Sequence, residues 1–97
     1  MSDRVLVSED SVLKLGRGIQ HRYDKQRDAW VLMAPERVVV LDEIAQAVMS
    51  EVLTSQGTLG QVIDTLAAQY GAPRAEIAGD VLELIQSFTD KKFLIES

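Results

Sequence analysis

Two short apolar runs separated by a polar turn place the strongest constraint on the fold of this 97-residue chain. The runs are 30-WVLM-33 and 38-VVVL-41, and the turn between them contains Pro35. β-Branched and aromatic residues favour strands, and proline cannot donate a hydrogen bond to a ladder, so we expect two strands joined by a turn. The second strand, at about 37–41, is apolar on both faces. Such a strand needs cover on both faces, and its outer edge needs a hydrogen-bonding partner.

An alternating segment before these runs predicts a third strand. Apolar and polar side chains alternate along 19-IQHRYD-24, a period of two that is typical of a half-buried strand. The polar sequence 25-KQR-27 that follows predicts a hairpin loop. We therefore expect three antiparallel strands, at about 19–24, 29–33 and 37–41.

Helical periodicity replaces the strand pattern after Asp42. Asp42 favours a helix N-cap, and Thr58 and Gln61 have the spacing of a capping box. Gly71 suits a C-terminal cap, and Pro73 suits the first turn of another helix. These signals predict helices at about 43–53, 59–70 and 73–89. Their expected apolar faces are Ile44, Val48, Met49 and Val52; then Leu59, Val62, Ile63, Leu66, Ala67 and Tyr70; then Ile77, Val81, Leu84, Ile85 and Phe88.

Strands followed by helices predict an α+β domain. We expect a winged helix-turn-helix-like arrangement, with an N-terminal three-stranded antiparallel sheet followed by a three-helix bundle. The length fits one domain over residues 1–97. Residues 1–12 carry weak signals and are predicted to form an extension or a flexible tail, and 93–95 to form a short apolar tail. No signal peptide or apolar run of about 20 residues is visible, so we expect a soluble cytoplasmic protein without membrane contact.

The sequence contains few residues suited to catalysis or metal binding. There is no cysteine and a single histidine, His21, which excludes cysteine nucleophiles, thiolate metal sites and iron–sulfur ligation. A lone histidine within a strand pattern favours a structural role. Trp30 is expected to pack in or beside the core, and Glu76, Asp80 and Glu83 are typical of a solvated helix face. We therefore expect no enzymatic activity and no cofactor.

The charge distribution weighs against nucleic acid as a partner. The net charge is −5, and the expected helix 59–70 contains no Lys or Arg. The expected helix 73–89 contains Arg74 but also several carboxylates. Phosphates would be repelled by both helices. A winged-helix nucleic-acid-binding or regulatory domain is kept as the alternative function.

A longer set of motifs resembles a known family. Residues 16–43 contain R-x-x-x-x-R-Y-D, W-V-L-x-A-P-E-R and L-D-E, and 62-VIDTLAAQYGAP-73 and 80-DVLELIQ-86 extend the match. From Leu13 onward the chain resembles the PqqD family of pyrroloquinoline quinone biosynthesis, and W-V-L-x-A-P-E-R is the most specific segment. The sequences 55-SQG-57 and 92-KFL-94 depart from the common family pattern, but both lie outside the third expected strand.

The resemblance implies a peptide chaperone with a winged-helix-like fold, also called a RiPP recognition element. Such a protein binds the ribosomal precursor peptide PqqA and presents it to the radical SAM enzyme PqqE. That enzyme, rather than this chain, would hold the iron–sulfur clusters and join a glutamate to a tyrosine of the peptide.

The free edge of the third expected strand gives this role a physical basis. An extended peptide can add there as a fourth strand. Alternatively, residues 1–12 could cover the edge, or a second copy could pair with it in a homodimer. The sequence leaves open whether Val38 or Val39 carries the outward-facing amide, and which face of the strand packs on the helices. The candidate peptide-binding residues are Arg37, Val38, Val39, Val40 and Leu41 on the strand and Asp80, Leu84 and Ser87 on the third helix.

Overall fold

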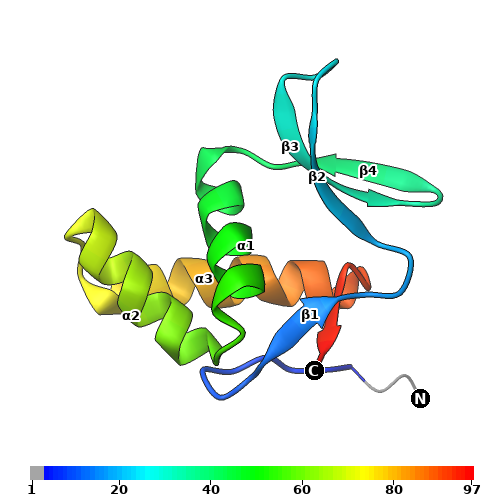
Figure 1. Cartoon of the computed structure of the whole chain (residues 1–97). Coiled ribbons are helices and arrows are strands. Elements are labelled where there is room, and N and C mark those ends of the chain that lie inside the picture. Colours follow the sequence, from blue (N-terminus) through cyan, green and yellow to red (C-terminus); the bar gives the residue numbers. More distant parts are fainter. Residues whose placement is uncertain (1–3) are drawn as a thin grey trace.

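The computed structural model describes residues 4–97, which form an α+β fold of five strands and three helices (Figure 1). The strands are β1 (Leu13–Leu15), β2 (Gln20–Asp24), β3 (Ala29–Ala34), β4 (Arg37–Val40) and β5 (Leu94–Glu96). The helices are α1 (Glu43–Ser55), α2 (Leu59–Tyr70) and α3 (Arg74–Asp90). Within residues 4–97, none of the helices combines the length and apolar character needed to cross a bilayer.

The larger sheet is antiparallel and has the order β2-β3-β4, so β4 lies at one edge. β2 and β3 are joined by a turn over 25–28, in which Asp28 has a left-handed backbone (φ 53°). β3 and β4 are joined through Pro35 and Glu36 alone. β4 ends at Val40 rather than at the expected residue 41, although Leu41 still donates its N–H to the Trp30 C=O.

The sequence pattern does not predict the smaller sheet, which is formed by β1 and β5. Leu15 lies opposite Leu94 in this antiparallel pair, and the Ser97 N–H donates to the Val12 C=O at 2.8 Å. The residues that directly follow the expected extension therefore pair with the expected apolar tail. Strands this short carry too little alternation to be distinguished from irregular chain in a sequence.

Side-chain caps fix where α1 and α2 begin. The Asp42 carboxylate accepts a 2.7 Å hydrogen bond from the Ala45 N–H. Thr58 and Gln61 bond each other's backbone N–H groups reciprocally, which completes the capping box that the sequence predicts. These contacts satisfy amides at the helix start that have no partner within the helix.

The helix ends depend on backbone conformation. α1 continues to Ser55, beyond the expected end at residue 53, because Gln56 rather than Gly57 adopts the left-handed conformation (φ 56°). Pro73 occupies the N-cap position of α3, so the helix begins at Arg74 rather than at the proline.

The main core lies where the three helices meet the two sheets. Its fully buried side chains include Leu32, Met49, Leu59, Ile63, Ile85 and Phe93. Burial of an aliphatic or aromatic side chain of this size contributes about 1.5–3 kcal/mol relative to exposure. The predicted inward positions of Ile44 and Tyr70 are wrong, because these side chains are 69% and 58% exposed.

His21 and Trp30 form an aromatic stack on the larger sheet. Their ring centroids are 4.9 Å apart, and Tyr23 meets Trp30 edge-on. The His21 Nε2 lies 2.8 Å from the Gln46 Oε1 on α1. These contacts link the sheet to α1 and give His21 a structural role.

Candidate functional site

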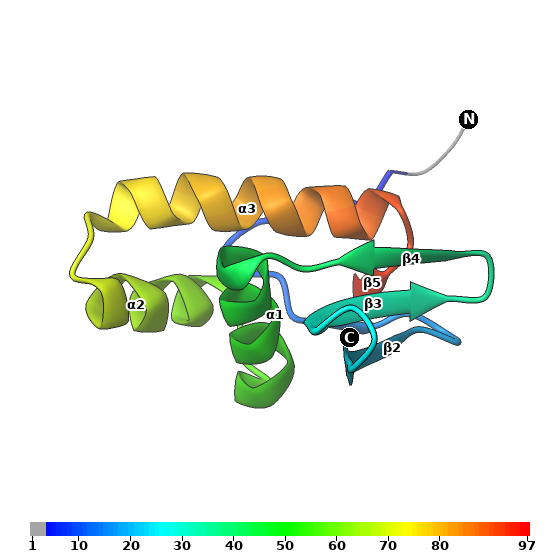
Figure 2. The same ribbon diagram turned by 90° about the horizontal axis from the view of Figure 1, so that it is seen from above.

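The free edge of β4 is the edge nearer to α3. In Figure 2, β4 lies between β3 and the C-terminal half of α3, and the strand and the helix run in opposite directions. No other strand in the described part of the chain pairs with this edge. An edge of this kind can pair with an added strand unless something covers it.

Hydrogen-bond register determines which amides of β4 point outward. The Leu41 N–H donates to the Trp30 C=O at 2.9 Å, and the pairing of β3 with β4 keeps the same register throughout. Amides alternate along an antiparallel strand, so the Val39 N–H also points toward β3. Val38 and Val40 therefore direct their N–H and C=O groups away from β3.

The side chains of β4 also divide between two environments. Leu41 is buried, and Val39 packs half-buried against the core. Val38 and Val40 are 37% and 54% exposed. The face that carries Val39 and Leu41 therefore packs inward, and the other face leaves two valines accessible.

Arg37 connects the start of β4 to the end of α3. Its guanidinium lies 4.9 Å from the centroid of the buried Phe93 ring and donates a hydrogen bond to the Lys91 C=O. This contact combines a cation–π interaction with a partner for a carbonyl near the helix end. The side chain of Arg37 therefore positions β4, a role that the sequence does not reveal.

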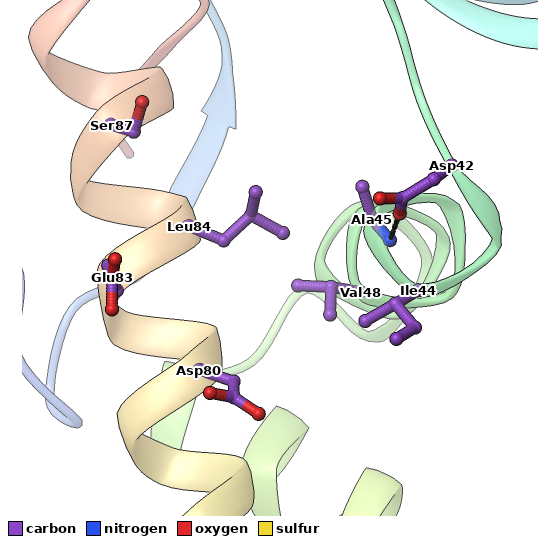
Figure 3. A pocket seen from close by; sticks show the side chains of 8 residues that line it. All are labelled: Asp42, Ile44, Ala45, Val48, Asp80, Glu83, Leu84 and Ser87. Carbon is purple, nitrogen blue, oxygen red and sulfur yellow. Dashed lines mark hydrogen bonds between the residues drawn. The ribbon is translucent and has the colours of Figure 1, made fainter.

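A groove with a volume of about 450 Å³ lies between the start of α1 and α3 (Figure 3). Leu84 points across it toward Ala45 and Val48. The predicted helix residues Asp80, Leu84 and Ser87 all line this groove. The residues Arg37 to Leu41 do not line it; they lead into it through Asp42, which does.

Five further lining residues are absent from the sequence-based prediction of the site: Asp42, Ile44, Ala45, Val48 and Glu83. Asp42 is recognisable in the sequence only as a helix cap, and helical spacing assigns Ile44 to the core. Their position in the groove follows from the placement of α1 against α3. A tertiary relation of this kind leaves no local signal in the sequence.

Carboxylates border the groove, and apolar side chains form its floor. Asp80 and Glu83 make no ion pair within residues 4–97. The described residues include no group of three or more His, Cys, Asp or Glu side chains that could hold a metal ion. The arrangement suits binding of an apolar or positively charged segment.

Residues 4–7 contact α3, and residues 9–12 contact the start of α2 and the C-terminal residue, so neither part lies on the edge of β4. The Val5 C=O accepts a hydrogen bond from the Gln86 side chain at 2.8 Å, and the Val7 N–H donates to the same side chain at 2.9 Å. The alternative in which the N-terminal segment covers the edge is therefore not found for residues 4–12, and residues 1–3 lie outside the described part of the chain.

Two ion pairs hold this N-terminal segment in place. Arg4 bonds Asp90 at 2.8 Å, and Arg74 bonds Glu9 at 2.6 Å. In each pair the hydrogen bond from the guanidinium lowers the pKa of the carboxyl group below its ordinary value. The pairs are exposed and individually weak, so the backbone bond from the Gly60 N–H to the Glu9 C=O is an important part of the anchorage.

Fold and groove together define a small α+β domain with an open sheet edge at β4 and a groove between α1 and α3. Residues 29–94 match the family model described as coenzyme PQQ synthesis protein D (PqqD), and the chain belongs to this family. The matched range includes the W-V-L-x-A-P-E-R segment, so the family resemblance predicted from the sequence is confirmed.

Relatives cover nearly the whole chain. A protein of Bradyrhizobium diazoefficiens named "PqqA binding protein" is 43% identical over 96% of this chain and 89% of its own length. A protein of Xanthomonas campestris pv. campestris with the same name is 43% identical over 91% of this chain and 95% of its own length.

Two solved structures share the fold. The solution structure of the PqqD part of Methylobacterium extorquens PqqCD, described as a stand-alone RiPP recognition element, has a TM-score of 0.75 and 34% identity, over 92% of this chain and 94% of that one. The crystal structure of PqqD from Xanthomonas campestris has a TM-score of 0.55 and 41% identity, over 90% and 96%. The arrangement of the elements therefore follows the Methylobacterium structure more closely, despite its lower sequence identity.

Proposed function

We propose that this chain binds a PqqA-like precursor peptide as an added strand on β4 and presents it to the radical SAM enzyme PqqE, without catalysing a reaction itself. The observation that carries the proposal is the register of β4, which turns the backbone of Val38 and Val40 away from β3 toward the side of α3. The relatives named PqqA binding protein support the class of ligand.

Strand addition would satisfy the outward N–H and C=O groups of Val38 and Val40. Alternate side chains of the peptide would then face the exposed valines, and the chain would continue into the groove at Asp80, Leu84 and Ser87. An extended peptide loses conformational entropy on binding, so we expect an affinity of about 1 μM, or about −8 kcal/mol.

A short edge also fits presentation to an enzyme. β4 contains only Arg37–Val40, so it pairs with a short segment and leaves the rest of a longer peptide accessible. Backbone pairing of one segment can therefore hold the peptide while PqqE acts on residues outside that segment.

Titration of the isotope-labelled protein with a synthetic PqqA peptide tests the proposal. We expect saturable changes in the amide shifts of Val38, Val40 and the groove residues of α3, because their backbone or side chains contact the peptide. The amides of β1 and β5 should change little. A scrambled peptide of the same composition is the control. Absence of saturable changes, or changes confined to the smaller sheet, would contradict the proposal.

A homodimer would use the same edge, since an exposed valine strand can pair with its copy. Peptide and partner subunit should then compete. We expect sedimentation velocity to show a dimer fraction that falls as the PqqA peptide approaches saturation. A dimer fraction that does not change at saturating peptide would show that self-association uses another surface.

No observation favours the alternative of nucleic-acid binding. α2 contains Asp64 and no Lys or Arg, and α3 turns Asp80 and Glu83 toward the groove. Both helices would have to approach phosphates against like charge. The groove chemistry therefore supports a peptide ligand better.

A further inference from the structure

A second, more apolar pocket opens where α1, α2 and α3 meet. Its volume is about 160 Å³. Buried Val48, Leu66 and Val81 form its floor, and the exposed side chains of Ile44 and Tyr70 stand at its border. We refer to it as the three-helix pocket.

The three-helix pocket adjoins the groove, because Ile44, Val48 and Asp80 line both. Figure 3 shows these three side chains together at one end of the groove. A peptide lying in the groove therefore comes within reach of the pocket at these three residues.

The exposure of Ile44 and Tyr70 is the main clue to its use. Helical spacing places both on apolar faces, yet more than half of each side chain is accessible. With Val38 and Val40 they account for four of the large apolar side chains that the described residues leave exposed. Val38 and Val40 lie on β4, whereas Ile44 and Tyr70 border the pocket, so apolar side chains are exposed at both places that the peptide is proposed to contact. An apolar surface with a polar rim marks an interaction site.

The distance along α3 from the groove to the pocket corresponds to a short run of extended peptide. Ser87 lines the groove toward the C-terminal end of α3, and Ile77 lines the pocket toward its N-terminal end. The helical rise between these two residues is about 15 Å. An extended chain covers that distance with about four or five residues.

Charge narrows the choice of occupant further. Asp80 stands at the junction of groove and pocket, Glu83 lies one turn further along α3, and neither has an ion-pair partner within residues 4–97. An acidic side chain beside them would be repelled, whereas Lys or Arg would be attracted.

We propose that the three-helix pocket binds a bulky apolar side chain of the peptide, about four or five residues from the segment paired with β4, with a Lys or Arg beside it that reaches Asp80. The proposal rests on the proposed function, since the peptide enters from the β4 edge. It adds a side-chain anchor to recognition that otherwise depends on backbone pairing.

The test compares matched exposed residues. The double variant Ile44→Ser/Tyr70→Ser removes the apolar border, and Leu6→Ser is the control, because Leu6 is 71% exposed and lies on the N-terminal segment. By calorimetry with a synthetic PqqA peptide, we expect the double variant to bind about tenfold more weakly, the effect of losing most of one buried aliphatic side chain. Leu6→Ser should bind like the wild type.

An alanine scan of the peptide identifies the anchor. Against wild-type protein, alanine at one apolar peptide position should weaken binding about tenfold. With the Ile44→Ser/Tyr70→Ser variant, the same peptide change should weaken binding by about twofold or less, because the pocket no longer holds the side chain. Asp80→Asn should weaken binding at low salt and have a smaller effect at 1 M salt, where charges are screened.

Three other results would distinguish failure of the pocket assignment from failure of the proposed function. If Val38→Pro abolishes peptide binding and the double variant binds as tightly as the wild type, the pocket assignment is wrong and strand addition stands. If the double variant keeps its peptide affinity but loses affinity for PqqE, the pocket belongs to the enzyme interface and the assignment is again wrong. If the wild type binds no PqqA peptide, both proposals fall.

Discussion

The variant Val38→Pro should bind the PqqA peptide at least tenfold more weakly than the wild type and remain folded. The Val38 N–H points away from β3, so proline there removes a hydrogen bond to the added strand and leaves the native sheet intact. Tenfold corresponds to about 1.4 kcal/mol, which is the size of one or two strand hydrogen bonds at about 1 kcal/mol each.

Val39→Pro is the matched control, and its effect should fall on the fold. Val39 lies opposite Leu32 with its N–H toward β3, so proline leaves a carbonyl of the sheet without its partner, at a cost of about 1–3 kcal/mol. In thermal unfolding followed by circular dichroism, we expect Val39→Pro to have a lower Tm than the wild type. The Tm of Val38→Pro should be close to that of the wild type. Calorimetry then measures the affinity of the folded Val38→Pro variant for the PqqA peptide. Wild-type affinity of folded Val38→Pro would disprove strand addition at β4.

The second large effect is expected from Phe93→Ala, which should lower the free energy of unfolding by about 3–5 kcal/mol. Phe93 is fully buried, meets Phe88 edge-on at a centroid distance of 6.2 Å and supports the guanidinium of Arg37. Its removal leaves a cavity between α3 and the sheets. Urea unfolding followed by circular dichroism measures the loss.

Ile95→Ala provides the comparison for Phe93→Ala. Ile95 is a neighbouring apolar residue on β5 but is 37% exposed, so its truncation should cost about 1 kcal/mol or less. Equal losses for the two variants would show that Phe93 does not organise the core. A folded Phe93→Ala variant should also bind peptide more weakly, since Arg37 then loses the ring that positions it.

The longer elements of the fold could be predicted because their signals are local. Alternation marks β2, and the caps at Asp42 and Thr58 mark the starts of two helices. β1 and β5 could not be predicted in this way, because each depends on a partner far along the chain. The exposure of Ile44 and Tyr70 could not be predicted either, because their helical spacing matches that of core residues. Only the packing of the helices shows that both side chains are exposed.

The candidate site also combines features that the sequence predicts with features that depend on tertiary structure. The sequence predicts a free strand edge, and the structure shows that Val38 rather than Val39 carries the outward amide there. Alternation alone cannot fix this parity, because it depends on the hydrogen-bond register with β3. The predicted group on α3 lies together in the groove, and its contact with a peptide stays a prediction until the titration is done.

The pairing of β1 with β5 joins the two ends of the described chain, and we expect it to form late in folding. The strands of the larger sheet are joined by short turns, at 25–28 and through Pro35 and Glu36, so their closure restricts little chain. Leu13 must meet Glu96 across nearly the entire sequence, and the entropy lost on closing a loop grows with its length. We therefore expect the hairpins to form before β1 pairs with β5, an order that pulsed amide hydrogen exchange during refolding would test.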